Sequence, residues 1–395
     1  MADRAHVRAA VNLLTGIVFA GLLAMPALDA AFGLDRTMAP EEKRQLAPQP
    51  GLPRSFQAVA ELPKAFDKYL DDHFGFRSLL LRLHARATVC WLGVPPSPNV
   101  EIMVGRHGWL FFTGESSVPY IEGRNPFSES DLEAWQRSLR QRNNWLASRG
   151  VRYLLVFAPG SPSIYPEHLP RWVRPSSHGT RLDQLMSAMR GYPEVAVLDL
   201  RPALLQGKLW APVWFRTDTH WNMVGAWIAY DSIMKNLTRW FPRAQPASFS
   251  SFNVALGQSP GGDLAAMAGI QGLTSEAIPW MAPKLGWRWR TVESADYATL
   301  RPWPKLQQPV ITACDHGDIP RVVIFRDSFG MALSPFLSEH FGRGVYLWIH
   351  DFEPSVIERE RPDLVIQEYA ERRLSVLSPA NPPALTPEPL KPTHN

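Results

Sequence analysis

The first long pattern in the chain is an uncharged apolar run of 20 residues from Ala9 to Leu28. A helix of this length, rising about 1.5 Å per residue, spans the roughly 30 Å hydrocarbon core of a bilayer. Arg4 and Arg8 precede the run, so the positive-inside rule places the N-terminus in the cytoplasm and the following chain outside. A cleaved signal peptide is the alternative. The run exceeds the usual h-region of about 7–15 residues, and Asp29 interrupts the small residues of a cleavage site. We therefore expect an uncleaved signal anchor.

Further along, short continuous apolar runs alternate with helical patterns. The apolar runs predict buried strands over 151–158, 195–200, 321–325, 344–349 and 363–367. Helical patterns predict helices over 128–149, 177–190, 222–241, 330–341 and 354–361. Apolar strands that alternate with helices are typical of a parallel sheet covered on both faces. The predicted fold class is α/β, with the sheet flanked by helices.

These patterns divide the chain into successive parts. They are a cytoplasmic tip (1–8), a transmembrane signal anchor (9–29), a juxtamembrane linker (30–63), one large α/β body (64–377) and a disordered Pro-rich tail (378–395). Within the body, a helical pattern follows the linker, and residues 102–112 predict two short strands around a turn. Region 243–310 is rich in Pro and Trp, shows little periodicity and predicts an irregular insertion.

Composition narrows the class of protein. The 395 residues are 45% hydrophobic and 20% charged, which excludes a disordered chain and a polytopic membrane protein. The net charge of +4 is dispersed, so we expect no nucleic-acid partner. The two cysteines, Cys90 and Cys314, allow at most one disulfide and do not form a zinc motif. The 15 Trp and 37 Pro suit a surface that handles sugars.

Candidate chemistry lies in two segments, FRTDTHWN (215–222) and VVIFRDSFG (322–330). Ser328 follows an apolar strand and precedes a helix, at the carboxyl edge where open α/β sheets bind ligands. A serine hydroxyl needs a base to become a nucleophile, and His220 is the candidate base. Asp218 lies two residues earlier and would share a face with His220 in extended chain, where it could orient the imidazole.

Each of these residues also has a structural interpretation. Ser328 could be a helix N-cap, His220 a loop histidine, and Asp218 a cap for the helix near Asn222. The Ser328 amide and the glycines of SPGGDL (259–264), Gly262 among them, are candidate oxyanion donors.

Three further interpretations concern neighbouring residues. Trp221 could line the site or belong to the core. Asn222 could donate a hydrogen bond there or cap the following helix. A metal site built on Asp218, His220 and His316 is not supported by the spacing, so we expect no metal and no cofactor.

Three motifs together resemble a known family. DTHWN (218–222), RDSFG (326–330) and GRHGWLFF (105–112) are similar to signatures of the alginate-type, AlgX/AlgJ-like O-acetyltransferases, which carry an SGNH-hydrolase-like domain. The similarity covers about residues 56–377. The resemblance implies an SGNH-like fold, a triad of Ser328, His220 and Asp218, and acetylation of a bacterial exopolysaccharide.

The resemblance also implies a location and a partner. The location is the inner membrane, with the catalytic domain in the periplasm. The partner is a polytopic membrane-bound O-acyltransferase that passes acetyl groups outward. The sequence departs from the family pattern in three places. Arg326, itself a candidate substrate-binding or oxyanion residue, occupies a position that is glycine in GDSL-type motifs. Pro162 replaces a frequent lysine, and region 243–310 matches poorly.

Three functions follow from the sequence. The leading one is a polysaccharide O-acetyltransferase that works through an acyl-serine. The second is a membrane-anchored SGNH esterase or deacetylase, in which water rather than a sugar hydroxyl resolves the same intermediate. The third is a non-catalytic scaffold of a polysaccharide export complex that keeps the fold.

Overall fold

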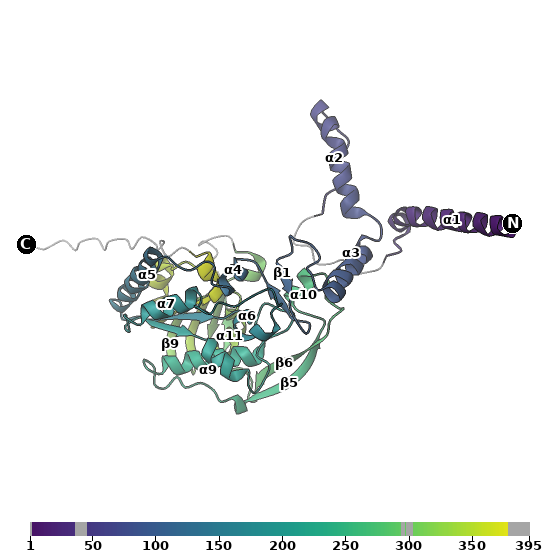
Figure 1. The fold of residues 1–395 in the computed structure, drawn as a ribbon. Helices are drawn as coiled ribbons and strands as arrows, with labels where there is room; N and C mark the ends of the chain where they lie inside the picture. Colours follow the sequence, from purple (N-terminus) through teal and green to yellow (C-terminus); the bar gives the residue numbers. More distant parts are fainter. Residues whose placement is uncertain (1, 36–45, 294–296, 298–302, 378–395) are drawn as a thin grey trace, which may run out of the picture. The chain divides into compact units, whose positions relative to one another are not determined.

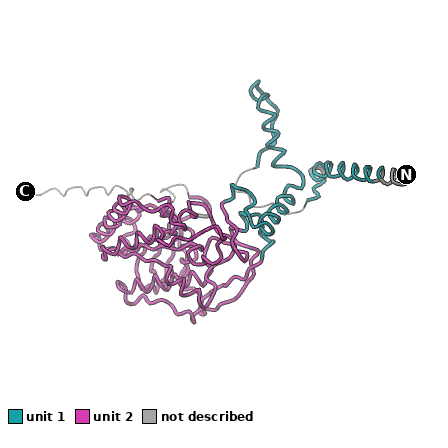
Figure 2. The backbone as a smooth tube through the Cα atoms, viewed as in Figure 1, with its two compact units in different colours: residues 1–100, 265–274 teal, residues 101–264, 275–395 magenta. Residues whose placement is uncertain are grey.

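The computed structural model describes residues 2–35, 46–293, 297 and 303–377. It forms two compact units, Met1–Val100 with Ala265–Thr274, and Glu101–Leu264 with Ser275–Asn395 (Figure 2). The body predicted over 64–377 contains residues of both units, because 64–100 and 265–274 belong to the first. The predicted disordered tail and residues 36–45 of the predicted linker lie outside the described residues.

The first unit is helical. Its elements are α1 (Ala2–Phe32), α2 (Phe56–His73), α3 (Arg77–Ala85) and the π-helical η1 (Arg86–Leu92) (Figure 1). Within α1, Val11–Asp29 is long and apolar enough to cross a membrane, and none of it is buried. The helical pattern after the linker breaks at Phe76, whose φ of 60° is left-handed, so α2 and α3 are separate helices.

The second unit is built on a seven-stranded sheet of order β4-β3-β11-β9-β10-β8-β7. Its strands are β3 (Arg152–Ala158), β4 (Ala196–Asp199), β7 (Arg290–Val292), β8 (Val310–Ala313), β9 (Ile319–Phe325), β10 (Phe341–Leu347) and β11 (Leu364–Ala370). The strands from β4 to β10 are parallel, as predicted, whereas β8 and β7 pair antiparallel at one edge. The α/β prediction is confirmed, and the sheet is mixed rather than wholly parallel.

Helices cover the sheet on both faces. The helices of this unit are α4 (Ser117–Ile121), α5 (Glu129–Ala147), α6 (Ser161–Ile164), α7 (Arg181–Met189), α8 (Arg201–Gly207), α9 (Met223–Leu237), α11 (Gly330–Ser338) and α12 (Pro354–Glu360), and α10 (Asp263–Met267) begins in it and continues into the first unit. The β9–α11–β10 and β10–α12–β11 crossovers step in opposite directions along the sheet. Right-handed crossovers therefore put α11 and α12 on opposite faces. In Figure 1, α5 and α7 lie on one side of the sheet and α9 on the other. The interior strand β11 is buried along its whole length, as expected for a parallel strand covered on both faces.

Region 243–310 is more regular than the sequence predicts. It holds an antiparallel ribbon of β5 (Phe252–Ser259) and β6 (Glu276–Pro283), and it also supplies β7. Most side chains of β5 are exposed. Because neither face of this strand is wholly buried, its sequence lacks the alternation that identifies a half-buried strand. The two predicted short strands form as the hairpin β1 (Ile102–Val104) and β2 (Leu110–Phe112).

Candidate active site

Asp218 and His220 lie on a tight loop that leads into α9. An isolated antiparallel bridge between Trp214 and Trp221 closes this loop. Asp218 Oδ1 accepts hydrogen bonds from the His220 amide at 2.9 Å and from His220 Nδ1 at 2.8 Å. The i, i+2 spacing thus gives the carboxylate two bonds to one residue. Together they fix the imidazole ring and place its proton on Nδ1.

The electrostatics of the pair favour a basic imidazole. Burial lowers the pKa of His220, but the hydrogen bond and charge of Asp218 outweigh burial, so the net pKa is raised above its usual 6.5. Burial likewise opposes ionisation of Asp218, yet the bond to His220 holds the pKa of that carboxyl below its ordinary value. The pair therefore stabilises a protonated, positively charged imidazole.

The second ring nitrogen faces the other candidate segment. His220 Nε2 is buried and, among the described residues, has no hydrogen-bond partner. The His220 ring packs against Phe329, with centroids 5.1 Å apart, and Phe329 is the residue directly after Ser328. The structure thus brings the loop that carries Asp218 and His220, called the base loop below, next to the turn that carries Ser328. The two lie about a hundred residues apart in sequence.

Ser328 lies between β9 and α11, at the carboxyl edge of the sheet, and is partly exposed. Within the described part of the chain, its hydroxyl makes no hydrogen bond to His220 or to any other residue. Its amide likewise donates to no described acceptor, so that N–H is available to a bound group. The helix N-cap interpretation of Ser328 receives no support, since α11 has no side-chain cap.

A second segment, at Gly262 and Asp263, forms hydrogen bonds with the base loop, and the sequence did not predict them. We call this segment, together with Glu276, the clamp. Asp263 accepts the Thr219 amide at 2.7 Å and donates its own amide to Asp218 Oδ2 at 3.0 Å. Its Oδ2 lies 3.8 Å from His220 Nδ1. Burial, and then the charge of Asp218, raise the pKa of Asp263. Asp263 is therefore a positioning residue. In the sequence, only its place in the GGDL stretch (261–264) drew attention to it.

Glu276 completes the clamp from the start of β6. It is buried, accepts the Arg216 amide at 2.7 Å and accepts a hydrogen bond from the Thr217 hydroxyl. Thr217 Oγ1 in turn accepts the Gly262 amide at 3.0 Å. Residues on both sides of the loop thus bond its backbone, which fixes the direction in which His220 points.

Beneath Ser328, a buried acidic pair joins β9 to β11. Asp327 accepts the amides of Phe329 at 2.9 Å and Ala370 at 2.8 Å, and its own amide donates to Glu368 at 3.1 Å. Burial, followed by the charge of Asp327, raises the pKa of Glu368 well above its usual range. Burial thus favours the protonated form of Glu368, and the hydrogen bonds of Asp327 hold the turn that presents Ser328.

The other predicted site residues have structural roles in core packing, helix capping and hydrogen bonding to the backbone. Trp221 is 1% exposed and packs edge-on against Phe329, so it belongs to the core beneath the site rather than to its lining. Asn222 caps α9, accepting the amides of Val224 and Gly225 at 3.0 and 3.1 Å. Arg326 is buried and donates to the Asp327 carbonyl at 3.0 Å, with its guanidinium over Trp348.

Gly262 also differs from its predicted part in the site. Its amide is engaged by Thr217, so it is not free to bind an oxyanion. Its importance is spatial instead: a Cβ at this position would lie 2.4 Å from Asp218 Cβ and Oδ2. Glycine is therefore required for the clamp to approach the Asp218 carboxylate.

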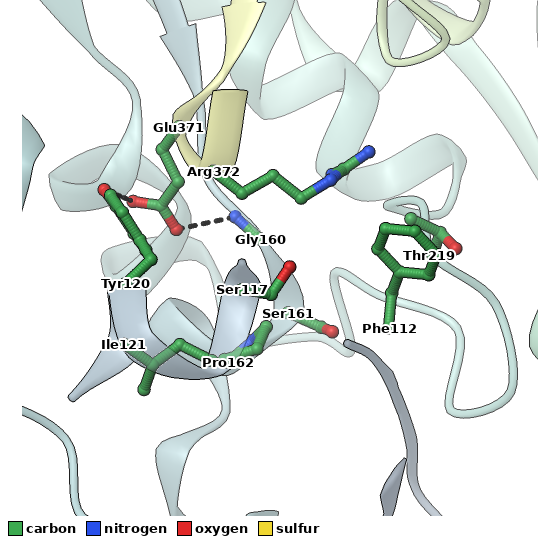
Figure 3. A pocket seen from close by; sticks show the side chains of 10 residues that line it. All are labelled: Phe112, Ser117, Tyr120, Ile121, Gly160, Ser161, Pro162, Thr219, Glu371 and Arg372. Carbon is green, nitrogen blue, oxygen red and sulfur yellow. Dashed lines mark hydrogen bonds between the residues drawn. The ribbon is translucent and has the colours of Figure 1, made fainter. Parts of the chain in front are cut away.

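A pocket opens beside the base loop, lined among others by Thr219, Phe112, Gly160 and Arg372 (Figure 3). Glu371 lines the pocket beside Tyr120 and accepts the Gly160 amide at 2.8 Å. The Arg372 side chain extends across the pocket toward Phe112 and Thr219 and pairs with Glu115 at 3.0 Å. A bound group would thus meet a cationic side chain next to the residue that precedes His220.

The geometry also bears on metals and disulfides. Asp218, His220 and Asp263 offer ligand atoms within 4.8 Å of one another. Their hydrogen bonds to each other already account for this closeness, and His316 is exposed on the turn after β8, outside the group. Cys90 is exposed and Cys314 is buried, and both are free thiols.

Comparison with known proteins finds a resemblance in the region that carries the base loop. The family model for the SGNH hydrolase-like domain of the acetyltransferase AlgX matches residues 102–293, slightly less than half of the chain. This part of the chain is similar to an AlgX-type SGNH domain. The matched range includes Asp218, His220 and Gly262, and Ser328 lies beyond it.

The curated relatives that the chain matches are probable alginate O-acetylases named AlgJ. The chain is 27% identical over 233 residues to the probable alginate O-acetylase AlgJ of Pseudomonas aeruginosa, covering 57% of this chain and 56% of that protein. It is 30% identical over 188 residues to the AlgJ of Pseudomonas fluorescens, covering 47% and 45%. The match thus spans about half the length of these relatives.

A solved structure shares the fold. Bacillus cereus PatB1 superposes with a TM-score of 0.52 at 15% identity, over 70% of this chain and 98% of that chain. At this identity the likeness concerns the fold alone. Together with the family match, it confirms the SGNH-like α/β class that the sequence motifs predicted.

Proposed function

We propose that the chain is a membrane-anchored O-acetyltransferase that places acetyl groups on hydroxyls of a bacterial exopolysaccharide, through an acyl intermediate on Ser328. The observation that carries this proposal is the Asp218–His220 pair. Its 2.8 Å bond holds Nδ1, while Nε2 is buried without a described partner beside the Ser328 turn. An imidazole held in this way accepts a proton at Nε2, as a general base does. The AlgX-type domain and the AlgJ relatives support acetyl transfer to a polysaccharide.

The first half-reaction forms the acyl-serine. His220 Nε2 takes the proton of Ser328 Oγ while Oγ bonds to the carbonyl carbon of the acetyl donor. The leaving group then departs with the proton returned by His220. Catalytic hydrogen bonds often shorten only when substrate binds, so we expect the Ser328 hydroxyl to turn onto Nε2 as the donor enters.

The second half-reaction resolves the intermediate. A sugar hydroxyl gives its proton to His220 Nε2, and its oxygen attacks the acetyl group on Ser328. The ester forms on the sugar, and Ser328 Oγ leaves with the proton from His220. Both half-reactions pass through a tetrahedral intermediate with a negatively charged oxygen. We assign the Ser328 amide, which has no described acceptor, as one of its donors.

The location follows from α1. Its span Val11–Asp29 is about 28 Å long at 1.5 Å per residue, close to the thickness of a bilayer core. Arg4 and Arg8 precede it, so we place the N-terminus in the cytoplasm and the catalytic unit in the periplasm. A catalytic unit on that side needs acetyl groups delivered across the membrane. A polytopic membrane-bound O-acyltransferase as donor partner meets this need.

The test compares wild type with Ser328→Ala. The matched control is Ser334→Ala on α11, whose hydroxyl bonds the Met331 carbonyl within its own helix. Each protein receives p-nitrophenyl acetate with and without a de-O-acetylated polymer, alginate first. Intact mass spectrometry measures acetyl-enzyme, and NMR measures polymer esters and free acetate. Wild type and Ser334→Ala should form acetyl-enzyme and acetylate the polymer, and Ser328→Ala should do neither.

The other outcomes overturn the proposal. Polymer acetylation by folded Ser328→Ala would exclude the acyl-serine mechanism. Acetyl-enzyme that releases only acetate, whatever polymer is present, would identify an esterase. A folded wild-type protein that never acquires an acetyl group from the donor would favour the scaffold.

A further inference from the structure

The helical segment α3–η1 of the first unit carries an exposed apolar surface. Leu79, Leu80, Leu83, Trp91 and Leu92 are exposed, the last two by more than 70%. This surface is distinct from the inner side of the same segment, which is already packed. Ala85 is buried there next to Gly269, and Arg82 donates to the Gln271 carbonyl at 3.2 Å.

The charges of the segment have one sign. Its basic side chains are Arg77, Arg82, Arg86 and His84, and no Asp or Glu occurs from residue 77 to residue 100. The Arg86 guanidinium lies over the ring of Trp91, 5.9 Å from its centroid. Leucine and tryptophan beside arginine, without acidic residues, are typical of helices that lie in the interface of an anionic bilayer.

The start of α3 is attached to the end of the candidate membrane span. The Phe76 amide donates to Asp29 Oδ2 at 2.7 Å. Gly75 is buried, and a Cβ there would lie 2.1 Å from the carbonyl oxygen of Pro26. Only a glycine allows this approach. Because Asp29 is the last residue of the span, α3 begins where the span leaves the hydrocarbon core.

We propose that α3 and η1 lie on the outer surface of the bilayer that α1 crosses, with these five apolar side chains in the phospholipid interface and the arginines at its headgroups. The proposal rests on the membrane anchor that is part of the proposed function. The segment would then give the protein a second, parallel contact with the membrane, next to its transmembrane helix.

The chain contains its own probe for this arrangement. Cys90 is exposed beside Trp91, whereas Cys314 is buried. Full-length protein in phosphatidylethanolamine–phosphatidylglycerol nanodiscs is labelled on Cys90 with a nitroxide. Power saturation then compares its accessibility to oxygen, which concentrates in lipid, with that to a water-soluble nickel chelate. We expect a several-fold excess of oxygen accessibility at position 90.

Two variants in a Cys90→Ser background separate the proposal from the anchor. Gly16→Cys places the label on α1, where the side chain has open space, and Ser250→Cys places it on an exposed site of the second unit. Position 16 should report lipid and position 250 water. Lipid at 16 with water at 90 would overturn the interfacial helix and leave the anchor intact. Water at 16 would overturn both.

A substitution tests the apolar surface itself. Changing Leu79, Leu80 and Leu83 together to Gln should move the Cys90 label toward the aqueous values, whereas the control Leu205→Gln, an exposed leucine on α8, should not. Phosphatidylcholine nanodiscs should weaken the contact, because the arginines lose their anionic headgroups. A label that stays aqueous in lipid alone and is shielded only by an added polytopic protein would refute the lipid contact.

Discussion

Replacing Gly262 with alanine should displace Asp218 from His220. The new Cβ would lie 2.4 Å from Asp218 Cβ and Oδ2, whereas ordinary contact begins near 3.4 Å, so these groups must separate by about 1 Å. Asp218 cannot easily rotate away, because His220 holds one of its oxygens and the Asp263 amide holds the other. A shift of this size in a catalytic group costs about 10²-fold in rate. Overpacking costs about 1–3 kcal/mol of stability.

The assay is the rate at which Ser328 acquires an acetyl group from p-nitrophenyl acetate, together with the thermal midpoint. Alanine keeps the amide that donates to Thr217, so a loss of rate reports the added methyl group and not a lost hydrogen bond. Gly191→Ala is the matched control, since its nearest neighbour is the Ala188 carbonyl at 3.8 Å. A wild-type rate in folded Gly262→Ala would refute the clamp as the device that orients His220.

Three other substitutions test the surrounding groups. Asp218→Asn should slow acylation by about 10⁴-fold, because the amide favours the wrong imidazole tautomer. It should also move the rising limb of the rate–pH profile to lower pH, because Asp218 holds the pKa of His220 above 6.5; an unmoved limb would contradict this. Asn222→Ala should lower the free energy of unfolding by about 1 kcal/mol and leave acylation near wild type, since Asn222 caps α9. Lost acylation at full stability would instead place Asn222 in the site. Glu368→Gln should become more stabilising, relative to wild type, as pH rises. The raised pKa of Glu368 favours folding while the group is protonated, and that contribution is lost as pH rises through the folded-state pKa. Thermal midpoints measured from acid to alkaline pH check this, and a constant difference would argue against a protonated Glu368.

The sequence predicts local features of this site well. Asp218 and His220 are two residues apart, so extended chain geometry is sufficient to pair them. Ser328 follows a continuous apolar strand, and the sheet edge on which it lies follows from that strand being parallel. The parallel strands themselves are apolar because both faces of the sheet are covered.

Features that depend on distant packing were not predictable. The Asp263 amide bonds to Asp218, 45 residues earlier in the chain, and no periodicity in the sequence predicts such a hydrogen bond. Strands β7 and β8 are short. They lie in or at the end of the Pro- and Trp-rich region, where turn-forming residues interrupt the hydrophobic pattern by which a strand is recognised. Trp221 and Asn222 had two interpretations each, and only the packing of Phe329 and the start of α9 assigns one to core and the other to cap.

The clamp on the base loop has a consequence for how the two units communicate. Gly262 and Asp263 stand just before the chain leaves the second unit for residues 265–274 of the first, and Glu276 stands just after it returns. The chain passes between the units at residues 100–101 and again through segment 265–274, and this second connection is flanked by the residues that hold Asp218 and the amides of the base loop. A displacement of segment 265–274 would act directly on Asp263 and Glu276, the residues whose carboxylates bond the backbone of the base loop.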